Sequence, residues 1–549
     1  MAEHTLHSIA YPILDEAQIA QAANCTTLAP KRYRDGETLI AIGDRAFKFF
    51  IVKSGEVEIL DYSGDEPKTV TIHRKGQFTG EISYLTGTPA IFRAVARGDC
   101  EVFEISVEAL RHLLNQCPGL SDIILQAFIA RRQRLRESPN FIGLRVIGSR
   151  YSADTFRVRD FLARNRVLFT WMDLETDPQV GQLLKEFGLT EADTPVVACS
   201  HLLLLRNPSN QKLADEVGIH QSLERTVYDL LVVGAGPAGL AAAVYGASEG
   251  LRTAVLDCVG PGGQAGSSMR IENYLGFPTG LTGAELTDRA TLQANKFGAH
   301  LSVPTAATRL SFENGYAILD ADGSEPLTTK CLLIATGAQY RRLDVEGFER
   351  FEGTGVYYAA TPAEALLCRG CPAIVVGGGN SAGQAAVFLA EYANRVLLLI
   401  RGDDLNKNMS TYLVRRIEQT NNIELLTNTT IRRMKGNSHL EAIETVNSHD
   451  GQQRTIETPA VFSFIGATPR TDWLPAEIER DSKGFVRTGA AVAQSIHWGV
   501  TRPPSLLETS HPGVFAAGDV RSGSVKRVAS AVGEGAMSVQ FVHEYLKEM

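Results

Sequence analysis

The chain has 549 residues, of which 44% are hydrophobic and 21% are charged, and its formal net charge is −8. This composition is ordinary for a globular protein of several domains. The negative net charge argues against nucleic acid or an anionic membrane surface as a partner. No apolar run approaches the roughly 20 residues that span a membrane, and we expect no signal peptide. Eight scattered cysteines with one close pair are typical of a reducing compartment, so we expect a cytoplasmic protein.

Residues 1–138 form the first expected domain. Short apolar strands follow one another between residues 28 and 105, and turn residues such as Gly36, Gly43 and Gly55 separate them. This spacing is typical of a β-barrel or jelly roll. A helical stretch is expected at 107–136.

Residues 140–222 form the second expected domain, because strands and helices alternate there over short distances. Such alternation predicts a small α/β unit. The expected strands are 143–147, 167–172, 195–198 and 202–205, and the expected helices are 155–165, 178–187 and 213–217.

A buried strand at 229–233 leads into a glycine turn with Gly234, Gly236 and Gly239. The first glycine permits the turn, the second lets backbone approach a pyrophosphate, and the third lets helix and strand pack. The helix start then offers N–H groups and the positive end of its dipole to the phosphates. The next strand ends at Asp257, placed to accept a hydrogen bond from a ribose hydroxyl, so the segment predicts a dinucleotide-binding fold.

The stretch at 375–382, VVGGGNSA, repeats this strand, turn and helix start. Two such folds in one chain indicate two bound dinucleotides, and the usual pair is a flavin with a nicotinamide. The candidate residues of the second turn are Gly377, Gly379, Asn380, Ser381 and Ala382.

Residues 226–549 resemble the thioredoxin reductase family of two-dinucleotide flavoproteins. Besides the glycine turns they carry PGGQ at 261–264, IENY at 271–274, IATG at 334–337 and GVFAAGD at 513–519. The resemblance implies two Rossmann-like α/β domains of the three-layer ββα type, and a homodimer. An FAD domain in two parts, 226–345 and 461–549, would enclose an NAD(P)H domain at 346–460.

The resemblance also implies the FAD site. Gln264 and Asn273 would lie near the flavin ring, and Asp519 near the ribityl-phosphate region. The whole implied set is Gly234, Gly236, Gly239, Asp257, Gly263, Gln264, Asn273, Thr336, Gly337, Gly518 and Asp519.

Arg401, directly after the strand at 396–400, bears on the choice between NADPH and NADH. Relatives that use NADPH place several basic residues there to hold the 2′-phosphate, and only Arg401 stands here. One guanidinium can bind one phosphate, so we favour NADPH and leave NADH open.

The electron outlet departs from the family pattern. In the family a Cys-x-x-Cys followed by Asp lies over the flavin, and ungapped counting back from the second glycine turn places these positions at Ala360, Ala363 and Glu364. Both cysteines are therefore alanine and the acid is glutamate. Glu364 is a candidate catalytic residue, and ordinary thioredoxin reduction is in doubt.

The visible pair, Cys368 and Cys371, does not simply replace the missing one. A helix at 361–367 would carry Cys368 roughly 8–12 Å along its axis. The pair also precedes the nicotinamide strand, whose functional end is the opposite one. We expect two bystander thiols, with a remote electron relay as the alternative.

The unit at 140–222 resembles a thioredoxin or glutaredoxin fold. Thr194-Pro195-Val196 matches the cis-proline turn of those folds, whereas 152–155 reads Ser-Ala-Asp-Thr where their cysteines stand. A thioredoxin-like unit before a reductase-like unit is similar to the flavoprotein partner of bacterial peroxiredoxin. A docking role and a plain spacer both stay open.

Residues 1–138 resemble the cyclic-nucleotide-binding domain, through Gly55, the stretch 76–85 and Arg93. The resemblance assigns Glu81 to the ribose 2′-hydroxyl and Arg93 to the cyclic phosphate, with backbone N–H groups near Gly80 completing an anion site. Whether a cyclic nucleotide is bound stays open.

The sequence as a whole predicts an FAD-dependent NAD(P)H oxidoreductase that passes electrons to an external disulfide or dithiol protein. An iron–sulfur carrier as acceptor, as in thioredoxin-reductase-like ferredoxin reductases, and a non-catalytic nucleotide or redox sensor are the alternatives. No metal ion, nucleic acid or membrane is expected as a partner.

Overall fold

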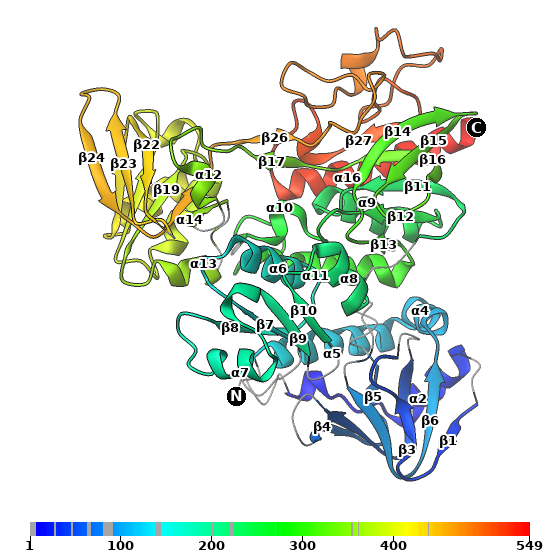
Figure 1. Cartoon of the computed structure of the whole chain (residues 1–549). Helices are drawn as coiled ribbons and strands as arrows, with labels where there is room; N and C mark the ends of the chain where they lie inside the picture. The colour runs from blue at the N-terminus through cyan, green and yellow to red at the C-terminus, as the bar shows by residue number, and fades with distance from the viewer. Residues whose placement is uncertain are drawn as a thin grey trace. The chain divides into compact units, whose positions relative to one another are not determined.

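The computed structural model describes residues 7–26, 29–44, 48–62, 67–80, 90, 92–137, 144–199, 203–219, 223–268, 271–352, 355–358, 360, 362–437 and 439–549 (Figure 1). Side chains at 133, 135–137, 362 and 363 are not among them. The chain forms two compact units, each described by itself. Unit 1 is 1–149, 157–224 and 292–304, and unit 2 is 150–156, 225–291 and 305–549. Within the described part, every helix is too short or too polar to span a bilayer.

The amino-terminal part of unit 1 is an antiparallel sheet with helices packed beside it. The sheet order is β1-β6-β3-β4, with β2 on β6 and β5 on β3, so the described strands do not close into a ring. Phe49, Phe78 and Phe128 join the sheet to helix α5 through ring contacts of 5.5–6.3 Å. The elements are α2 (Glu16–Thr26), β1 (Lys31–Tyr33), β2 (Thr38–Ile40), β3 (Phe49–Asp61), β4 (Lys68–His73), β5 (Phe78–Thr79), β6 (Arg93–Ile105), α4 (Val107–Gln116) and α5 (Pro118–Glu137).

The expected helical stretch at 107–136 is two helices. Cys117 ends α4 in a non-helical conformation. Pro118 begins α5 because proline, which lacks an N–H donor, is tolerated in a first helical turn and not in a helix interior.

The second part of unit 1 is a four-stranded sheet in the order β10-β9-β7-β8. Strands β7 and β8 are parallel, whereas β9 runs antiparallel to both β7 and β10. The bond between Thr194 and Pro195 is cis. The elements are β7 (Leu144–Gly148), α6 (Ala153–Arg164), β8 (Phe169–Asp173), α7 (Val180–Glu186), β9 (Val196–Cys199), β10 (Leu203–Arg206) and α8 (Asn210–Val217), which confirms the expected alternation to within three residues at each limit.

The first dinucleotide fold, in unit 2, is built on parallel strands. Strand β11 lies between β12 and β16, β27 pairs with β16, and the hairpin of β14 and β15 extends the sheet. Helix α16 packs on α9 so closely that a Cβ on Gly535 would lie 2.0 Å from the carbonyl oxygen of Ala238. The elements are β11 (Val227–Val233), α9 (Pro237–Ser248), β12 (Thr253–Leu256), α10 (Gly263–Gly266), β14 (Ala307–Glu313), β15 (Tyr316–Ala321), β16 (Leu327–Ile334), β27 (Val514–Ala516) and α16 (Val528–Glu548).

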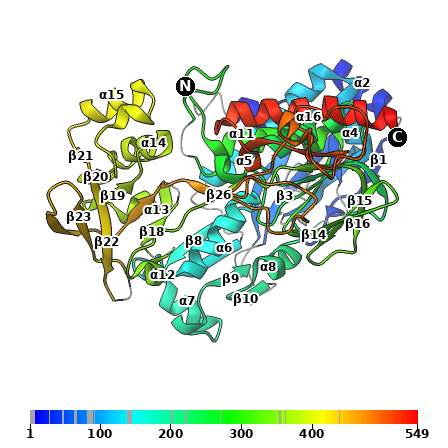
Figure 2. The same cartoon turned by 90° about the horizontal axis from the view of Figure 1, so that it is seen from above.

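The second dinucleotide fold has three layers (Figure 2). Its parallel sheet has the order β18-β25-β19-β20-β21, and a three-stranded antiparallel sheet, β22-β23-β24, covers one face. Helices α14 and α15 cover the other. The elements are β18 (Val356–Tyr357), α13 (Pro362–Leu367), β19 (Pro372–Val376), α14 (Asn380–Leu389), β20 (Arg395–Leu399), α15 (Thr411–Gln419), β21 (Ile423–Leu426), β22 (Thr429–Lys435), β23 (Ala442–Asn447), β24 (Gln453–Glu457) and β25 (Val461–Ser463).

Alternation along the central strands explains these layers. Val375 and Leu398 join the core shared with α14 and α15, whereas their neighbours Ile374 and Leu397 join the core shared with β22 and β23. Because both faces are covered, the strands are apolar at nearly every position. The expected three-layer ββα arrangement is thereby confirmed.

Two antiparallel strands connect the folds: β17 (Ala338–Tyr340) leaves the first fold and β26 (Ala467–Pro469) returns to it (Figure 1). The second fold is thus inserted into the first. Its sheet includes β25, which starts just after the expected limit at residue 460. The exact domain limits stay predictions.

Candidate functional site

The residues expected to hold the first dinucleotide gather at one edge of a sheet. Gly234 follows β11, Asp257 follows β12, and Thr336 follows β16 within two residues. Because β11 is parallel to both neighbours, the carboxyl ends of the three strands lie side by side. This is the edge at which open α/β sheets bind their ligands.

The three glycines of the first turn have different structural roles. Gly234 has φ +112°, and a Cβ there would lie 2.3 Å from the carbonyl oxygen of Ala335. A Cβ on Gly239 would lie 1.8 Å from the carbonyl oxygen of Gly234, so these two fix the turn and its packing. A Cβ on Gly236 would meet only the Cα of Gly263, at 3.9 Å. The space before the start of α9 is therefore open and lined by backbone, which fits a pyrophosphate.

The PGGQ loop lies against this turn. The N–H of Gly262 donates to the carbonyl oxygen of Ala235 at 2.8 Å. A Cβ on Gly263 would lie 3.0 Å from the Cα of Gly236, so backbone meets backbone there. Gln264 is the second residue of the short helix α10 (Gly263–Gly266).

The carboxylate of Asp257 accepts hydrogen bonds from the protein itself, which the sequence does not indicate. Its carboxylate accepts hydrogen bonds from the N–H groups of Ala235, Val259 and Gly260, each at 2.9 Å. A carboxylate offers about four acceptor positions. Asp257 therefore fixes two loops of the site and keeps room for one ribose hydroxyl.

The GVFAAGD stretch reaches the same edge. A Cβ on Gly518 would lie 3.1 Å from the Cβ of Ala238 in the first turn of α9. Burial raises the pKa of the neighbouring Asp519, Glu534 adds to that rise, and Lys526 opposes it. Sequence reasoning missed Glu534 of α16, whose carboxylate accepts from the N–H of Gly518 at 2.7 Å and pairs with Arg521.

Thr336 and Asn273, both expected in the FAD site, have different surroundings. The hydroxyl of Thr336 donates to the carbonyl oxygen of Arg470 at 2.9 Å, and Gly337 follows with φ +64°. Asn273 is exposed. Its neighbour Glu272 pairs with Arg416 of α15, with Nη1 at 3.0 and 3.2 Å from the two carboxylate oxygens.

In the second glycine turn, Gly377 has φ +140° and a Cβ there would lie 2.5 Å from the carbonyl oxygen of Phe464. Gly379 caps α14 and has open space beside it, as Gly236 has in the first turn. Asn380 instead accepts from the N–H of Ser410 at 2.7 Å, which ties α14 to the start of α15. Ala382 is fully buried and takes the packing role of a third glycine.

Arg401 is exposed at the carboxyl end of β20. The two acids that follow it are engaged: Asp403 pairs with Lys407 at 2.6 Å, and Asp404 accepts from the N–H of Asn406 at 2.8 Å. With its neighbouring acids held by other partners, Arg401 suits the 2′-phosphate of NADPH.

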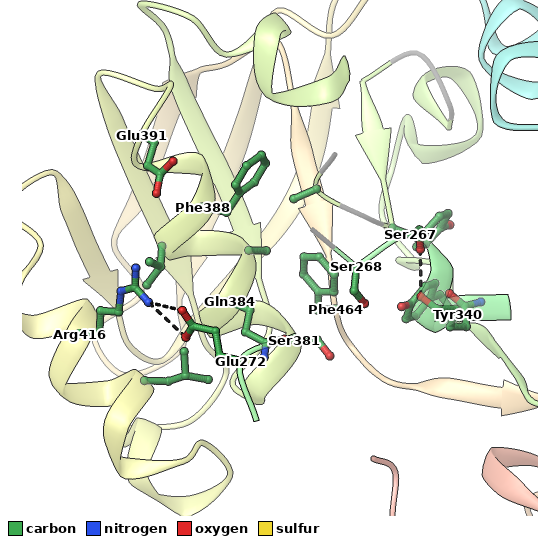
Figure 3. Close-up of a pocket in the computed structure, with 16 residues that line it drawn as sticks. Ser267, Ser268, Glu272, Tyr340, Ser381, Gln384, Phe388, Glu391, Arg416 and Phe464 are labelled. Carbon is green, nitrogen blue, oxygen red and sulfur yellow. Dashed lines mark hydrogen bonds and ion pairs between the residues drawn. The ribbon is translucent and has the colours of Figure 1, made fainter. Parts of the chain in front are cut away.

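A cavity of about 110 Å³ lies where the two folds face each other (Figure 3). Tyr340 and Tyr358, stacked with an interplanar angle of 6°, form part of its wall. The ion pair of Glu272 and Arg416 crosses the gap between the folds. The lining residues are Gln264, Ser267, Ser268, Glu272, Tyr340, Tyr358, Ala360, Ser381, Gln384, Ala385, Val387, Phe388, Glu391, Leu413, Arg416 and Phe464.

Ala360, which ungapped counting aligns with the first family cysteine, lies in this cavity wall together with Gln264 and Ser381. The cavity thus brings together Gln264, which is expected beside the flavin ring, Ala360, and Ser381 of the second glycine turn. Ala363 has no described side chain. Glu364, in α13, is 3% exposed.

Cys368 and Cys371 lie elsewhere. Cys368 is fully buried in the apolar core beneath α14, where burial raises the pKa of its thiol to about 12. Cys371 is half-buried at the start of β19, the end opposite the glycine turn. Both are free thiols, and a buried thiol with a raised pKa is a poor nucleophile at neutral pH.

In unit 1, Gly80 has φ +109°, and a Cβ there would lie 2.1 Å from the carbonyl oxygen of Lys48. Arg93 is half-buried, and its guanidinium donates to the hydroxyl of Thr38 at 2.7 and 3.2 Å and to that of Tyr62 at 3.5 Å. Neutral partners leave the cation able to bind an anion. Glu81 lies outside the described residues.

Two family models match the chain. The model described as pyridine nucleotide-disulphide oxidoreductase matches residues 228–535, which include both glycine turns. The model described as cyclic nucleotide-binding domain matches residues 30–117, from β1 to α4.

The chain is also similar to individual thioredoxin reductases. That of Eremothecium gossypii is 31% identical over 331 residues, 59% of this chain and 99% of the relative. That of Bacillus subtilis is 30% identical over 327 residues, 59% of this chain and 97% of the relative. Among solved structures, T. acidophilum thioredoxin reductase is 28% identical with a TM-score of 0.53 and covers 58% of this chain and 99% of that one. The similarity extends over nearly the whole length of these enzymes.

Proposed function

The chain belongs to the pyridine nucleotide-disulphide oxidoreductase family and is an FAD-dependent NAD(P)H oxidoreductase, and from this premise we propose that it passes electrons to the disulfide of an external disulfide/dithiol protein. The observation that carries the proposal is Ala360 in the wall of the cavity beside Gln264. By ungapped counting in the sequence, this alanine corresponds to the first redox cysteine of the family, and it carries no thiol. Electrons therefore leave toward a partner that brings its own sulfur.

The chain's own residues position the two cofactors. Backbone N–H groups at the starts of α9 and α14 hold the two pyrophosphates, and Arg401 binds the 2′-phosphate of NADPH. Bound FAD supplies two-electron transfer between the nicotinamide and the acceptor. The net reaction converts NADPH, a proton and a protein disulfide into NADP⁺ and two thiols.

Glu364 is the proposed donor of a proton to the thiolate that is released when the acceptor's disulfide breaks. It is the retained acid of the family pattern, and at 3% exposure it is shielded from water. This role is that of a general acid.

The remaining domains are proposed to serve docking and regulation. The sheet order β10-β9-β7-β8 supports a thioredoxin-like unit that docks the acceptor without redox cysteines of its own. The amino-terminal cyclic nucleotide-binding domain is proposed to bind a cyclic nucleotide through Gly80, Glu81 and Arg93. We further propose a cytoplasmic homodimer, in keeping with eight free cysteines.

A second candidate acceptor is an iron–sulfur or related iron carrier. One relative, the 34.2 kDa protein in rubredoxin operon of Clostridium pasteurianum, is 30% identical over 323 residues. One-electron carriers need no thiol on the reductase, so the alanine at 360 suits them as well.

Anaerobic mixing of the purified protein with NADPH tests the proposal. Bleaching of the yellow flavin is expected, and a flavin that stays oxidised with both NADPH and NADH would instead support a non-catalytic sensor. The reduced protein is then offered oxidised thioredoxin, with thiols counted, and separately ferredoxin and rubredoxin, with their absorbance followed. Turnover with an iron protein and not with a disulfide protein would replace the first candidate by the second. Cyclic AMP and cyclic GMP, added to the same assay, test regulation.

A further inference from the structure

Arg470 has its backbone fixed beside the end of β16. Its carbonyl oxygen accepts hydrogen bonds from the hydroxyl of Thr336 at 2.9 Å and from the indole N–H of Trp473 at 3.3 Å. The residue directly follows β26, on which the chain returns from the second fold. The main chain of Arg470 thus belongs to the carboxyl edge of the first sheet.

The side chain of Arg470 ends at a different strand. Its Nη1 lies 3.1 Å from the Sγ of Cys258, which directly follows Asp257 at the end of β12. Strand β11 lies between β16 and β12, with Val232 in register with Val255 on one side and Leu333 on the other. A side chain that starts at β16 and ends at β12 therefore crosses the carboxyl end of β11. That end is the turn of Gly234 and Gly236.

The protein groups at this edge offer the guanidinium of Arg470 only a weak hydrogen-bond acceptor. A guanidinium carries a permanent charge and five N–H donors, whereas a thiol is a weak acceptor. Burial and the Asp257 carboxylate raise the pKa of the Cys258 thiol, so it is neutral at pH 7. The nearby Asp257 carboxylate already accepts from three backbone N–H groups. Arg470 itself is exposed.

We propose that Arg470 is an FAD-binding residue that crosses over the bound dinucleotide and donates charge-assisted hydrogen bonds to its diphosphate. The start of α9 contacts the phosphates from one side, and Arg470 closes the other. Cys258 positions the guanidinium and does not itself bind the cofactor. The inference rests on FAD occupying the first glycine turn.

Binding measurements with the full-length protein, stripped of flavin by chaotropic salt, test this role. Three probes separate the contacts: FAD carries the flavin, the diphosphate and the adenosine, ADP carries the diphosphate and the adenosine without the flavin, and riboflavin carries neither phosphate nor adenosine. Arg470→Ala is expected to raise the Kd for FAD and ADP about 10- to 100-fold, as loss of a charge-assisted contact does, and to leave riboflavin unchanged. Arg470→Lys should lose less, because it keeps the charge but not the planar fork.

Two further variants separate binding from structure. Cys258→Ala should change the Kd for FAD less than threefold, and Arg309→Ala, which removes an exposed arginine paired with Asp320 on the β14–β15 hairpin, should change it less than twofold. Raising the salt concentration should weaken ADP binding by the wild type more than by Arg470→Ala. Equal losses in Arg470→Ala and Cys258→Ala, or equal losses for ADP and riboflavin, would overturn the assignment in favour of a structural tie.

The premise and the inference fail in different ways. If Gly236→Val binds FAD as the wild type does, FAD does not occupy the first turn and the premise is wrong. If Gly236→Val loses FAD and Arg470→Ala retains wild-type affinity for FAD and ADP, only the role of Arg470 is wrong. Circular dichroism of each variant confirms that the fold is kept, and Arg470→Lys serves as the test variant should Arg470→Ala not fold.

Discussion

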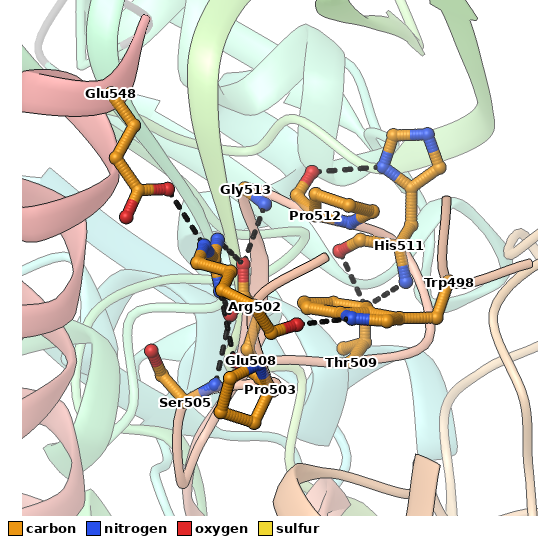
Figure 4. A network of polar contacts seen from close by, with 10 residues as sticks. All are labelled: Trp498, Arg502, Pro503, Ser505, Glu508, Thr509, His511, Pro512, Gly513 and Glu548. Carbon is orange, nitrogen blue, oxygen red and sulfur yellow. Dashed lines mark hydrogen bonds and ion pairs between the residues drawn. The ribbon is translucent and has the colours of Figure 1, made fainter. Parts of the chain in front are cut away.

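The carboxylate of Glu508 has no solvent exposure and accepts two hydrogen bonds from the guanidinium of Arg502, at 2.7 and 2.8 Å (Figure 4). It also accepts from the N–H groups of Ser505 and Gly513, both at 3.0 Å. Arg502 reaches Glu548 near the end of α16 at 2.7 Å. This network fixes the segment 502–513, which directly precedes β27, and Gly518 follows two residues after the end of β27.

Glu508→Gln should destabilise unit 2. The change leaves Arg502 without its buried counter-charge. Breaking a buried ion pair lowers the free energy of unfolding by about 3 kcal/mol at the low end of the usual range. We expect the low end here because Arg502 is partly exposed. The temperature at which FAD fluorescence appears on heating should fall by several degrees. The matched control, Glu346→Gln, breaks the exposed pair with Arg433 and should shift that temperature by about a degree or less. Equal shifts would mean that the buried network contributes no more than a surface pair.

Gly236→Val should give a protein without FAD. Its Cβ would point into the backbone-lined space before α9, and the branched side chain would fill the position of the diphosphate. The absorbance ratio at 450 and 280 nm after purification measures FAD content. A fully yellow variant would refute the placement of FAD. Gly499→Val, at an exposed glycine without a positive φ where an added Cβ would meet nothing within 4 Å, is a control that should stay yellow.

The glycine turns were predictable because their constraint is local. At Gly234, Gly239 and Gly377 the backbone leaves no room for a Cβ, and that requirement is visible in the sequence spacing. The same holds for the apolar strands of the second fold, where two covered faces demand apolar residues at nearly every position.

Other features depend on residues that only the fold brings together. Arg470 and Cys258 are 212 residues apart, and Glu272 and Arg416 are 144 apart. Motif spacing carries no signal for such pairs. Motif membership also leaves out structural roles of side chains: Asn380, which lies within the expected nicotinamide set, accepts a hydrogen bond from the N–H of Ser410.

Arg401→Ala should separate the two nicotinamides. A charge-assisted contact to phosphate contributes about 1.5–3 kcal/mol, so the KM for NADPH should rise roughly 10- to 100-fold while that for NADH stays nearly constant. Steady-state kinetics with both donors and one acceptor measures this. Lys435→Ala is the control, because Lys435 is an exposed lysine paired with Glu444 on the three-stranded sheet β22-β23-β24. Equal losses with NADPH and NADH would remove Arg401 from the 2′-phosphate site.

His73 should make unit 1 sensitive to acid. It is 2% exposed, and burial, together with the neighbouring Arg131, lowers its pKa well below 6.5. Below about pH 6.5 the unfolded chain therefore binds a proton that the folded unit does not. The free energy of unfolding falls with pH in this range, by at most about 1.4 kcal/mol per pH unit, and levels off below the pKa of His73 in the folded unit. Calorimetry of the full chain between pH 7.5 and 5 should show this decline, and His73→Leu should flatten it. His112→Gln, at an exposed position of α4, should not.

The double variant Cys368→Ser/Cys371→Ser decides whether the thiol pair carries electrons. Cys368 is fully buried with its pKa raised to about 12, and Cys371 lies at the end of β19 remote from the glycine turn. Neither position borders the cavity that contains Ala360 and Gln264. Flavin reduction by NADPH and turnover with a disulfide acceptor should therefore stay within about twofold of the wild type, and anaerobic titration of either protein should take up two electrons per FAD. Because serine at 368 puts a hydroxyl into an apolar core, Cys368→Ala/Cys371→Ser serves as a second test variant. A wild type that takes up four electrons, two of which are lost in both variants while flavin reduction persists, would establish the pair as a relay between the flavin and the acceptor.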